Sequence, residues 1–348
     1  MGPAALERNA VKTSAPLTAL CLALAWLGAL RAISATPESN SVPTVLVIVG
    51  APGEAEYATN FVQQASRWTA VCQRAETRCV TFGLDAAGPT TTNDWQQLEH
   101  VLAAEPKEGS AELWLVLIGH GTYDGKEAKF SLRGPDLSAT TLAQWLKPFR
   151  RPVAVVDTSS ASAPFLNALS GTNRVVITAT RTGNEQSFAY FGQHLAAAIA
   201  DPAGDLDQDG QTSLLEAFLS ASARVAEFYQ TEGRLATEHA LLDDNGDGLG
   251  TPADWFRGTR ATKKAKEGRS LDGLRAHPWH LVRSPEERRM SPAARAKRDE
   301  LELDIARLRE SRPANPGDDY YHRLETVLRE LAALYEEIPK APAAEKIP

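Results

Sequence analysis

The chain has 348 residues and a formal net charge of −7, and 43% of its residues are hydrophobic against 23% charged. This balance is that of a folded globular protein with room for one mid-sized α/β domain and an appendage. Its Lys and Arg residues are spread along the chain except in the C-terminal region, which argues against nucleic acid as a partner.

The N-terminal segment has the features of a secretory signal peptide, in the usual order. Arg8 and Lys12 precede an apolar run at 15–30, and small residues follow at 32–35. We therefore expect residues 1–35 to be removed and the protein to be exported, to the periplasm or outside the cell. An uncleaved anchor is the alternative, but the run is short for a bilayer span. We expect no stable membrane anchor after cleavage.

Export would leave Cys72 and Cys79 in a compartment where thiols can oxidise. The two residues either form a disulfide between a helix end and the next strand, or remain two small buried hydrophobic side chains. The sequence does not give the distance that would decide between these alternatives.

Five apolar runs alternate with amphipathic segments from residue 44 onward. Short continuous runs of this kind are typical of strands buried on both faces of a parallel sheet. The predicted strands are 44–49, 78–82, 113–118, 153–156 and 174–178, and the predicted helices between them are 54–74, 93–104, 139–149 and 163–169. This alternation predicts an α/β fold with a doubly wound, mostly parallel sheet flanked by helices.

Two of the predicted strands lead into polar residues. The third run continues into the sequence GHG at 119–121, and the fourth into DTSSAS at 157–162. Because ligands bind beyond the carboxyl ends of strands in such a sheet, we expect His120 and Ser159 at one edge.

In order and spacing, these two strand ends resemble the signatures of caspase/legumain-type cysteine peptidases. The family pattern is His-Gly after the first strand, and an acidic residue, a small one, Cys, any residue, Ser and Gly after the second. The segments at 177–180 and 185–188 are also similar to the family's chain beyond its fifth strand. The resemblance covers about 44–254 and implies the caspase/legumain-like fold.

The resemblance also implies roles for single residues. His120 stands at the position of the catalytic base, the backbone N–H of Gly121 at that of an oxyanion donor, and Ser159 at that of the nucleophilic cysteine. A serine needs its base in direct contact and a third group that orients the base, and the sequence names no such group. Ala161 and Ser162 replace the family's Ser-Gly. We therefore predict a pseudopeptidase; the alternative is an active hydrolase that uses Ser159 with His120.

Residues 205–216 have the ligand spacing of an EF-hand calcium loop. Carboxylates occupy positions one, three and five, glycine position six, a backbone carbonyl position seven, a hydroxyl position nine and glutamate position twelve. Ca²⁺ prefers such hard oxygen ligands, and glycine permits the sharp turn. The predicted ligands are Asp205, Asp207, Asp209, Gln211, Ser213 and Glu216.

A second acidic stretch at 243–254 repeats the spacing, although the residues before it resemble a strand. This stretch is either a second Ca²⁺ site or an acidic turn. Its candidate ligands are Asp243, Asn245, Asp247, Leu249 and Asp254. Calcium bound only by the folded form would brace the C-terminal part of the domain.

The C-terminal region predicts an antiparallel helical hairpin at 284–340, joined by a basic linker at 257–283 to a domain at 36–256. The hairpin's two apolar stripes are Leu301, Ile305 and Leu308, then Leu324, Leu328, Leu331 and Tyr335. We expect the peptidase-like cleft at the strand ends that carry His120 and Ser159, together with the hairpin, to bind a peptide or protein partner. A calcium-braced structural or interaction module is a third alternative.

Overall fold

The structure is a computed structural model, and it describes residues 42–84, 93–265, 268, 270–313 and 316–337. The predicted signal peptide at 1–35 lies outside these residues. Among the described residues, no helix combines the length and the apolar character needed to cross a membrane.

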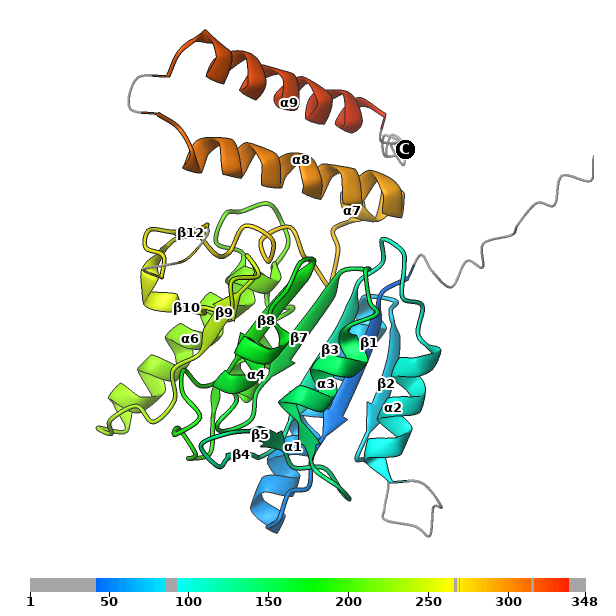
Figure 1. Cartoon of the computed structure of the whole chain (residues 1–348), viewed down its shortest axis with the longest axis vertical. Coiled ribbons are helices and arrows are strands. Elements are labelled where there is room, and N and C mark those ends of the chain that lie inside the picture. Colours follow the sequence, from blue (N-terminus) through cyan, green and yellow to red (C-terminus); the bar gives the residue numbers. More distant parts are fainter. Residues whose placement is uncertain (1–41, 85–92, 266–267, 269, 314–315, 338–348) are drawn as a thin grey trace, which may run out of the picture. The chain divides into compact units, whose positions relative to one another are not determined.

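A seven-stranded sheet of order β10-β9-β8-β7-β3-β1-β2 forms the centre of the fold (Figure 1). Its parallel strands are β1 (Thr44–Val49), β2 (Arg78–Phe82), β3 (Leu113–Ile118), β7 (Val153–Asp157) and β8 (Arg174–Thr178). Two antiparallel strands, β9 (Leu241–Asp243) and β10 (Thr251–Pro252), extend the sheet beyond β8.

Helices cover both faces of this sheet (Figure 1). The helices on one face are α1 (Ala55–Arg74), α5 (Phe191–Ala198) and α6 (Leu214–Thr231), and those on the other are α2 (Asp94–Ala104), α3 (Ala139–Leu146) and α4 (Ala163–Leu169). Along β3, Trp114 and Val116 belong to the first core, whereas Leu113 and Leu115 belong to the second. Alternate residues point to opposite faces, so a strand covered on both sides is apolar throughout. The predicted α/β fold with a mostly parallel sheet is confirmed.

Small elements connect the larger ones. A three-stranded sheet follows β3 and consists of β4 (Gly121–Tyr123), β5 (Ala128–Phe130) and β6 (Leu137–Ser138). The other short elements are the 3₁₀ helices η2 (Pro202–Gly204) and η3 (Ala253–Trp255) and the hairpin of β11 (Phe256–Arg257) with β12 (Arg260–Ala261).

The C-terminal helices are α7 (Pro285–Arg289), α8 (Pro292–Glu310) and α9 (Asp318–Glu336). Helix α8 buries all three residues of the first predicted stripe, while α9 packs on α8 with no side chain fully buried.

The stretch at 257–283, predicted as a linker from its basic composition, differs from that expectation in its second half. Ala276, Trp279 and Leu281 are buried in the core. The N–H of Leu214 donates to the carbonyl of Trp279 over 2.8 Å, which joins this segment to the start of α6. The chain from 270 to 283 is therefore part of the domain.

Candidate functional site

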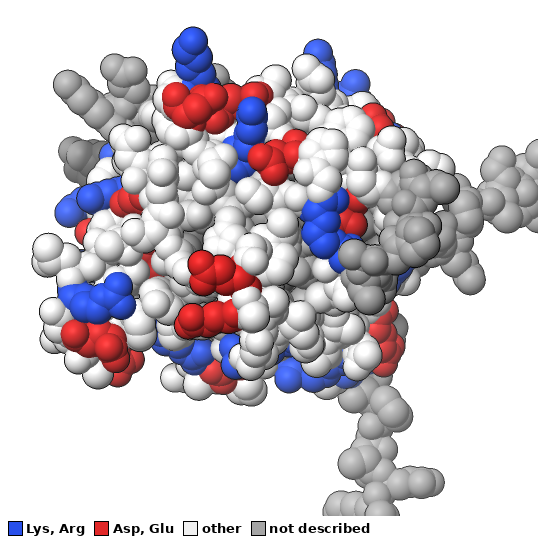
Figure 2. All heavy atoms as spheres, turned by 90° about the horizontal axis from the view of Figure 1, so that it is seen from below, with Lys and Arg blue, Asp and Glu red and all other residues white. Residues whose placement is uncertain are grey.

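The two strand ends singled out in the sequence converge in the structure. β3 and β7 are parallel neighbours, with Leu117 opposite Asp157. A Cβ placed on Gly121 would lie 2.7 Å from Oγ of Ser159, so the segments after the two strands are in contact. Figure 2 views the molecule from this edge, where acidic and basic side chains are interspersed and neither sign forms a continuous patch.

The ring of His120 is half-buried and has a fixed orientation. Its Nε2 lies 3.1 Å from the carbonyl oxygen of Pro52. A carbonyl can only accept, so Nε2 carries the proton and Nδ1 of the neutral ring is the free base. Tyr57 and Phe61 pack edge-on against the ring, with centroids 4.7 and 5.1 Å away. Pro52 therefore supplies the orienting group that the sequence does not name.

Ser159 lies in a segment that solvent does not reach. The side chains of Asp157, Ser159 and Ser162 are 0% exposed and that of Ser160 is 4% exposed. The hydroxyl of Ser159 donates to Oδ1 of Asp157 over 2.6 Å, and its backbone N–H donates to the same oxygen over 3.0 Å. Among the described residues, no hydrogen bond joins Ser159 to His120. The serine is thus held by a carboxylate within its own turn.

The backbone N–H of Gly121, predicted as an oxyanion donor, already has a partner. It donates to Oγ of Ser160 over 3.2 Å, and the hydroxyl of Ser160 donates back to the carbonyl of Gly121 over 3.1 Å. A Cβ on Gly121 would lie only 2.2 Å from the carbonyl oxygen of Ser160, so glycine is required for this close approach. Ser160 would have to turn away before Gly121 could bind an oxyanion.

The carboxyl of Asp157, which bonds Ser159, has a strongly raised pKa. Burial raises the pKa of its carboxyl to about 7, although the two hydrogen bonds from Ser159 act in the opposite direction. Oδ2 of Asp157 has no hydrogen-bond partner in the described part of the chain. The sequence places Asp157 at the acidic position of the family pattern, but its burial and its bond to Ser159 are visible only in the fold.

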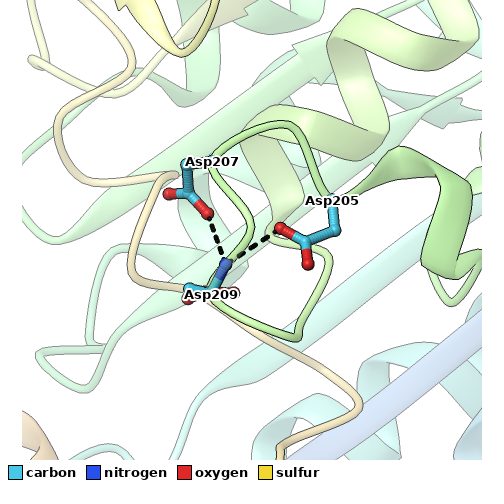
Figure 3. A group of neighbouring side chains, drawn as sticks. All are labelled: Asp205, Asp207 and Asp209. Carbon is cyan, nitrogen blue, oxygen red and sulfur yellow. Dashed lines mark hydrogen bonds between the residues drawn. The ribbon is translucent and has the colours of Figure 1, made fainter.

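The first acidic loop gathers three of its predicted ligands. Asp205, Asp207 and Asp209 each bring one oxygen within 4.8 Å of the others (Figure 3). Glu216, at position twelve, closes the loop through the backbone: one oxygen accepts from the N–H of Leu206 over 2.7 Å, and the other from the N–H of Ser213 over 2.8 Å. Predicted ligands one, three and five therefore converge, and Glu216 ties the loop to the start of α6.

The two acidic loops share one backbone conformation. In both, the residues at positions four and six have positive φ: Gln208 (64°), Gly210 (87°), Gly246 (76°) and Gly248 (76°). In both, the carboxylate at position one accepts from the N–H at position six, with Asp205 at 2.9 Å and Asp243 at 3.1 Å. In both, the residue at position five accepts from the N–H at position seven, which belongs to Gln211 and to Leu249.

The second loop is closed by a residue outside its predicted ligand set. Asp254 is exposed in η3. Buried Asp272 instead accepts from the N–H groups of Asp244 and Asn245, over 3.0 and 3.2 Å, and from the hydroxyl of Thr251 over 2.6 Å. Burial and the charge of Asp244 raise the pKa of Asp272 to about 8. Asp272 lies well beyond the acidic stretch, and no spacing rule would select it.

Both loops lie away from the edge that carries His120 and Ser159. In the second loop, Asp243 pairs with Val176, the central residue of β8, and because β9 is antiparallel to β8 the chain after Asp243 continues toward the start of β8. The first loop reaches α7, because the side-chain oxygen of Gln211 accepts from the N–H of Ser284 over 2.7 Å. Next to Ser284, Arg283 bonds Glu112, the residue before β3. The acidic loops are therefore at the amino ends of the parallel strands.

No family model matches the sequence, and a search of curated proteins finds no match. Similar solved structures include the Drosophila initiator caspase Dronc (12% identity, 60% of this chain and 81% of that chain covered, TM-score 0.39). They also include caspase-1 from Spodoptera frugiperda (8% identity, 59% of this chain and 87% of that chain covered, TM-score 0.37). A third is a protein from Geobacter sulfurreducens (10% identity, 58% of this chain and 92% of that chain covered, TM-score 0.36). Structural neighbours of the chain thus include caspases, and these weak similarities assign no activity to it.

Proposed function

We propose that this chain is an exported, calcium-binding protein of the caspase/legumain-like kind that has no peptidase activity and binds a peptide or protein partner. The observation that carries the proposal is the closed position of Ser159, whose hydroxyl and N–H both bond Asp157. A serine nucleophile must pass its proton to a base in direct contact. Here the imidazole of His120 bonds Pro52 and has no bond to Ser159.

The partner would dock at the edge where the strands end. Tyr57 and Phe188 stack with ring centroids 5.1 Å apart, beside His120, and both side chains are only partly buried. Partly exposed aromatic rings offer apolar contact area at low cost in side-chain entropy. A peptide can therefore be held at this edge without any chemistry at Ser159.

Calcium would be held by Asp205, Asp207 and Asp209, with the backbone carbonyl of Gln211 as a further oxygen ligand. Three carboxylate oxygens within 4.8 Å of one another match the hard-oxygen preference of Ca²⁺. Because the loop lies at the amino ends of the strands, the ion would brace the domain and would not take part in chemistry at the opposite edge. The second loop, with the same conformation, is proposed as a second site.

A fluorophosphonate probe for serine hydrolases tests the absence of activity. The wild-type protein, Ser159→Ala and His120→Ala are incubated with the probe, and labelled residues are located by peptide mass spectrometry. We expect no label at residue 159 in the wild type. Labelling of Ser159 that is reduced in His120→Ala would instead establish the active-hydrolase alternative.

Export has a separate test, because it does not depend on the site. The protein recovered from the periplasm or the medium is sequenced from its N-terminus. We expect it to begin near residue 36, after the small residues of the predicted cleavage site. Recovery of the full-length chain in the cytoplasmic or membrane fraction alone would contradict export with cleavage.

A further inference from the structure

A cavity of about 450 Å³ lies between α8 and the amino ends of three parallel strands. Its wall includes Glu112, Pro152 and Asn173, each of which immediately precedes a strand: β3, β7 and β8. Five arginines line this space, which we call the arginine cavity: Arg150, Arg275, Arg283, Arg295 and Arg307. Three acidic residues also line it: Glu112, Asp299 and Glu300.

All three acidic residues already have cationic partners. Glu112 accepts two hydrogen bonds from Arg283, over 2.8 and 2.9 Å. Asp299 accepts a bond of 2.7 Å from Arg298, which is not among the lining residues. Glu300 lies 3.6 Å from Lys297. The lining carboxylates are therefore already paired and are not free to balance Arg275 and Arg295.

Two half-buried arginines are bonded to neutral groups. Arg275 donates to the side-chain oxygen of Asn173 over 3.1 Å, and Arg295 donates to the carbonyl of Met290 over 2.6 Å. Burial lowers the pKa of both guanidinium groups; the charges of Arg307 and Arg283 lower it further, and nearby carboxylates act in the opposite direction. Among the described residues, Arg275 and Arg295 therefore bring positive charge to the arginine cavity that no ion pair neutralises, whereas Arg150, Arg283 and Arg307 each have a carboxylate partner.

We propose that the arginine cavity binds a small ligand that carries two or more oxyanion groups, either phosphates or carboxylates. Guanidinium groups bind such oxygens through paired, charge-assisted hydrogen bonds. The volume falls within the range of about 300–1,000 Å³ typical of small-molecule sites. The ligand would join α8 to the chain segments before β7 and β8, and its binding would stabilise the folded protein.

Titration of the full chain with sodium pyrophosphate, and separately with citrate, tests this site. Both titrations are followed by calorimetry and thermal unfolding, in EDTA and at constant ionic strength so that neither calcium nor bulk screening contributes. We expect saturable binding and a rise in Tm. Tighter binding of pyrophosphate would identify phosphate as the preferred group, and tighter binding of citrate would identify carboxylate.

The double variant Arg275→Gln/Arg307→Gln should bind at least about tenfold more weakly than the wild type, because each change removes a charge-assisted bond. Arg257→Gln removes an exposed arginine of β11 that is not among the lining residues, and should bind as the wild type does. If the double variant has a lower Tm without ligand, Arg307→Gln alone carries the comparison, since that side chain is 57% exposed.

Three results would overturn the proposal. One is equal affinity of the wild type and the Arg275 and Arg307 variants. Another is a rise in Tm no larger than sodium chloride produces at the same ionic strength. The third is the absence of saturable binding by both probes in the millimolar range.

Discussion

The hydroxyl of Ser159 lies 2.6 Å from a carboxylate oxygen of Asp157, and neither side chain is exposed to solvent. On the neighbouring strand end, His120 is oriented by the carbonyl of Pro52. The residues expected to act as nucleophile and base are therefore close in the fold but bonded to different partners. The hydroxyl of Ser159 bonds within its own turn, to Asp157. The ring of His120 is held in place by Pro52 but has no hydrogen bond from Ser159 through which it could accept a proton.

Gly121→Ala should destabilise the protein by about 1–3 kcal/mol or more, because the new methyl group would overlap the backbone of Ser160 at 2.2 Å. Gly171→Ala is the matched control, since its Cβ would meet its nearest neighbour, Arg174, only at 3.9 Å. Urea denaturation gives both free energies of unfolding. Equal losses in the two variants would show that the two strand ends are not packed as described.

Ionisation of the buried carboxyl of Asp157 should lower the free energy of unfolding as pH rises toward neutrality. Burial raises its pKa from 3.8 to about 7. Between these values the folded state keeps a proton that the unfolded state releases, so the free energy of unfolding falls by up to about 1.4 kcal/mol per pH unit.

Asp157→Asn cannot ionise and should lose this part of the pH dependence. The measurement compares the free energies of unfolding of wild type and variant at about pH 5 and about pH 8. A pH dependence identical in both proteins would mean that the carboxyl of Asp157 does not titrate in this range.

The strands could be predicted from the sequence because burial on both faces leaves a local signal. The runs at Thr44–Val49 and Leu113–Ile118 match β1 and β3 residue for residue. The bond between Ser160 and Gly121 could not be predicted, because it joins residues 39 positions apart and depends on the neighbouring positions of β3 and β7. The role of Asp272 in closing the second loop could not be predicted for the same reason, since its bond to Asp244 spans 28 positions.

Calcium should stabilise the protein through the loop at 205–216. At a hundredfold excess over its Kd, a ligand that binds only the folded state adds about 2.7 kcal/mol to the free energy of unfolding. Asp205→Asn should abolish most of this gain, while Asp254→Asn, a change at an exposed residue of η3, should leave the affinity of the first loop unchanged. Calorimetry and thermal unfolding with calcium or EDTA provide the comparison. A calcium affinity and a rise in Tm that are the same in Asp205→Asn as in the wild type would exclude this loop as a site, whereas a smaller remaining response is what the proposed second loop would give.

Cys72 and Cys79 should form a disulfide in the presence of glutathione disulfide. Both are free thiols that share a hydrogen bond, which lowers the pKa of Cys79 to about 7. A thiolate near neutral pH attacks a disulfide, and the neighbouring thiol then releases glutathione. Intact mass should show the loss of two hydrogens, with Cys79→Ser as the control. A lasting glutathione adduct on Cys79 would show that Cys72 cannot reach it.

Alkylation of a thiol introduced at position 159 tests the closed site most directly. Ser159→Cys is made in a Cys72→Ser/Cys79→Ser background, and iodoacetamide modification at residue 159 is followed by peptide mass spectrometry in native buffer and in urea. Because Ser159 is 0% exposed, we expect modification of the introduced thiol in urea and essentially none in native buffer. Rapid native modification that His120→Ala abolishes would contradict this expectation, since it would reveal an open site with an imidazole-activated thiolate.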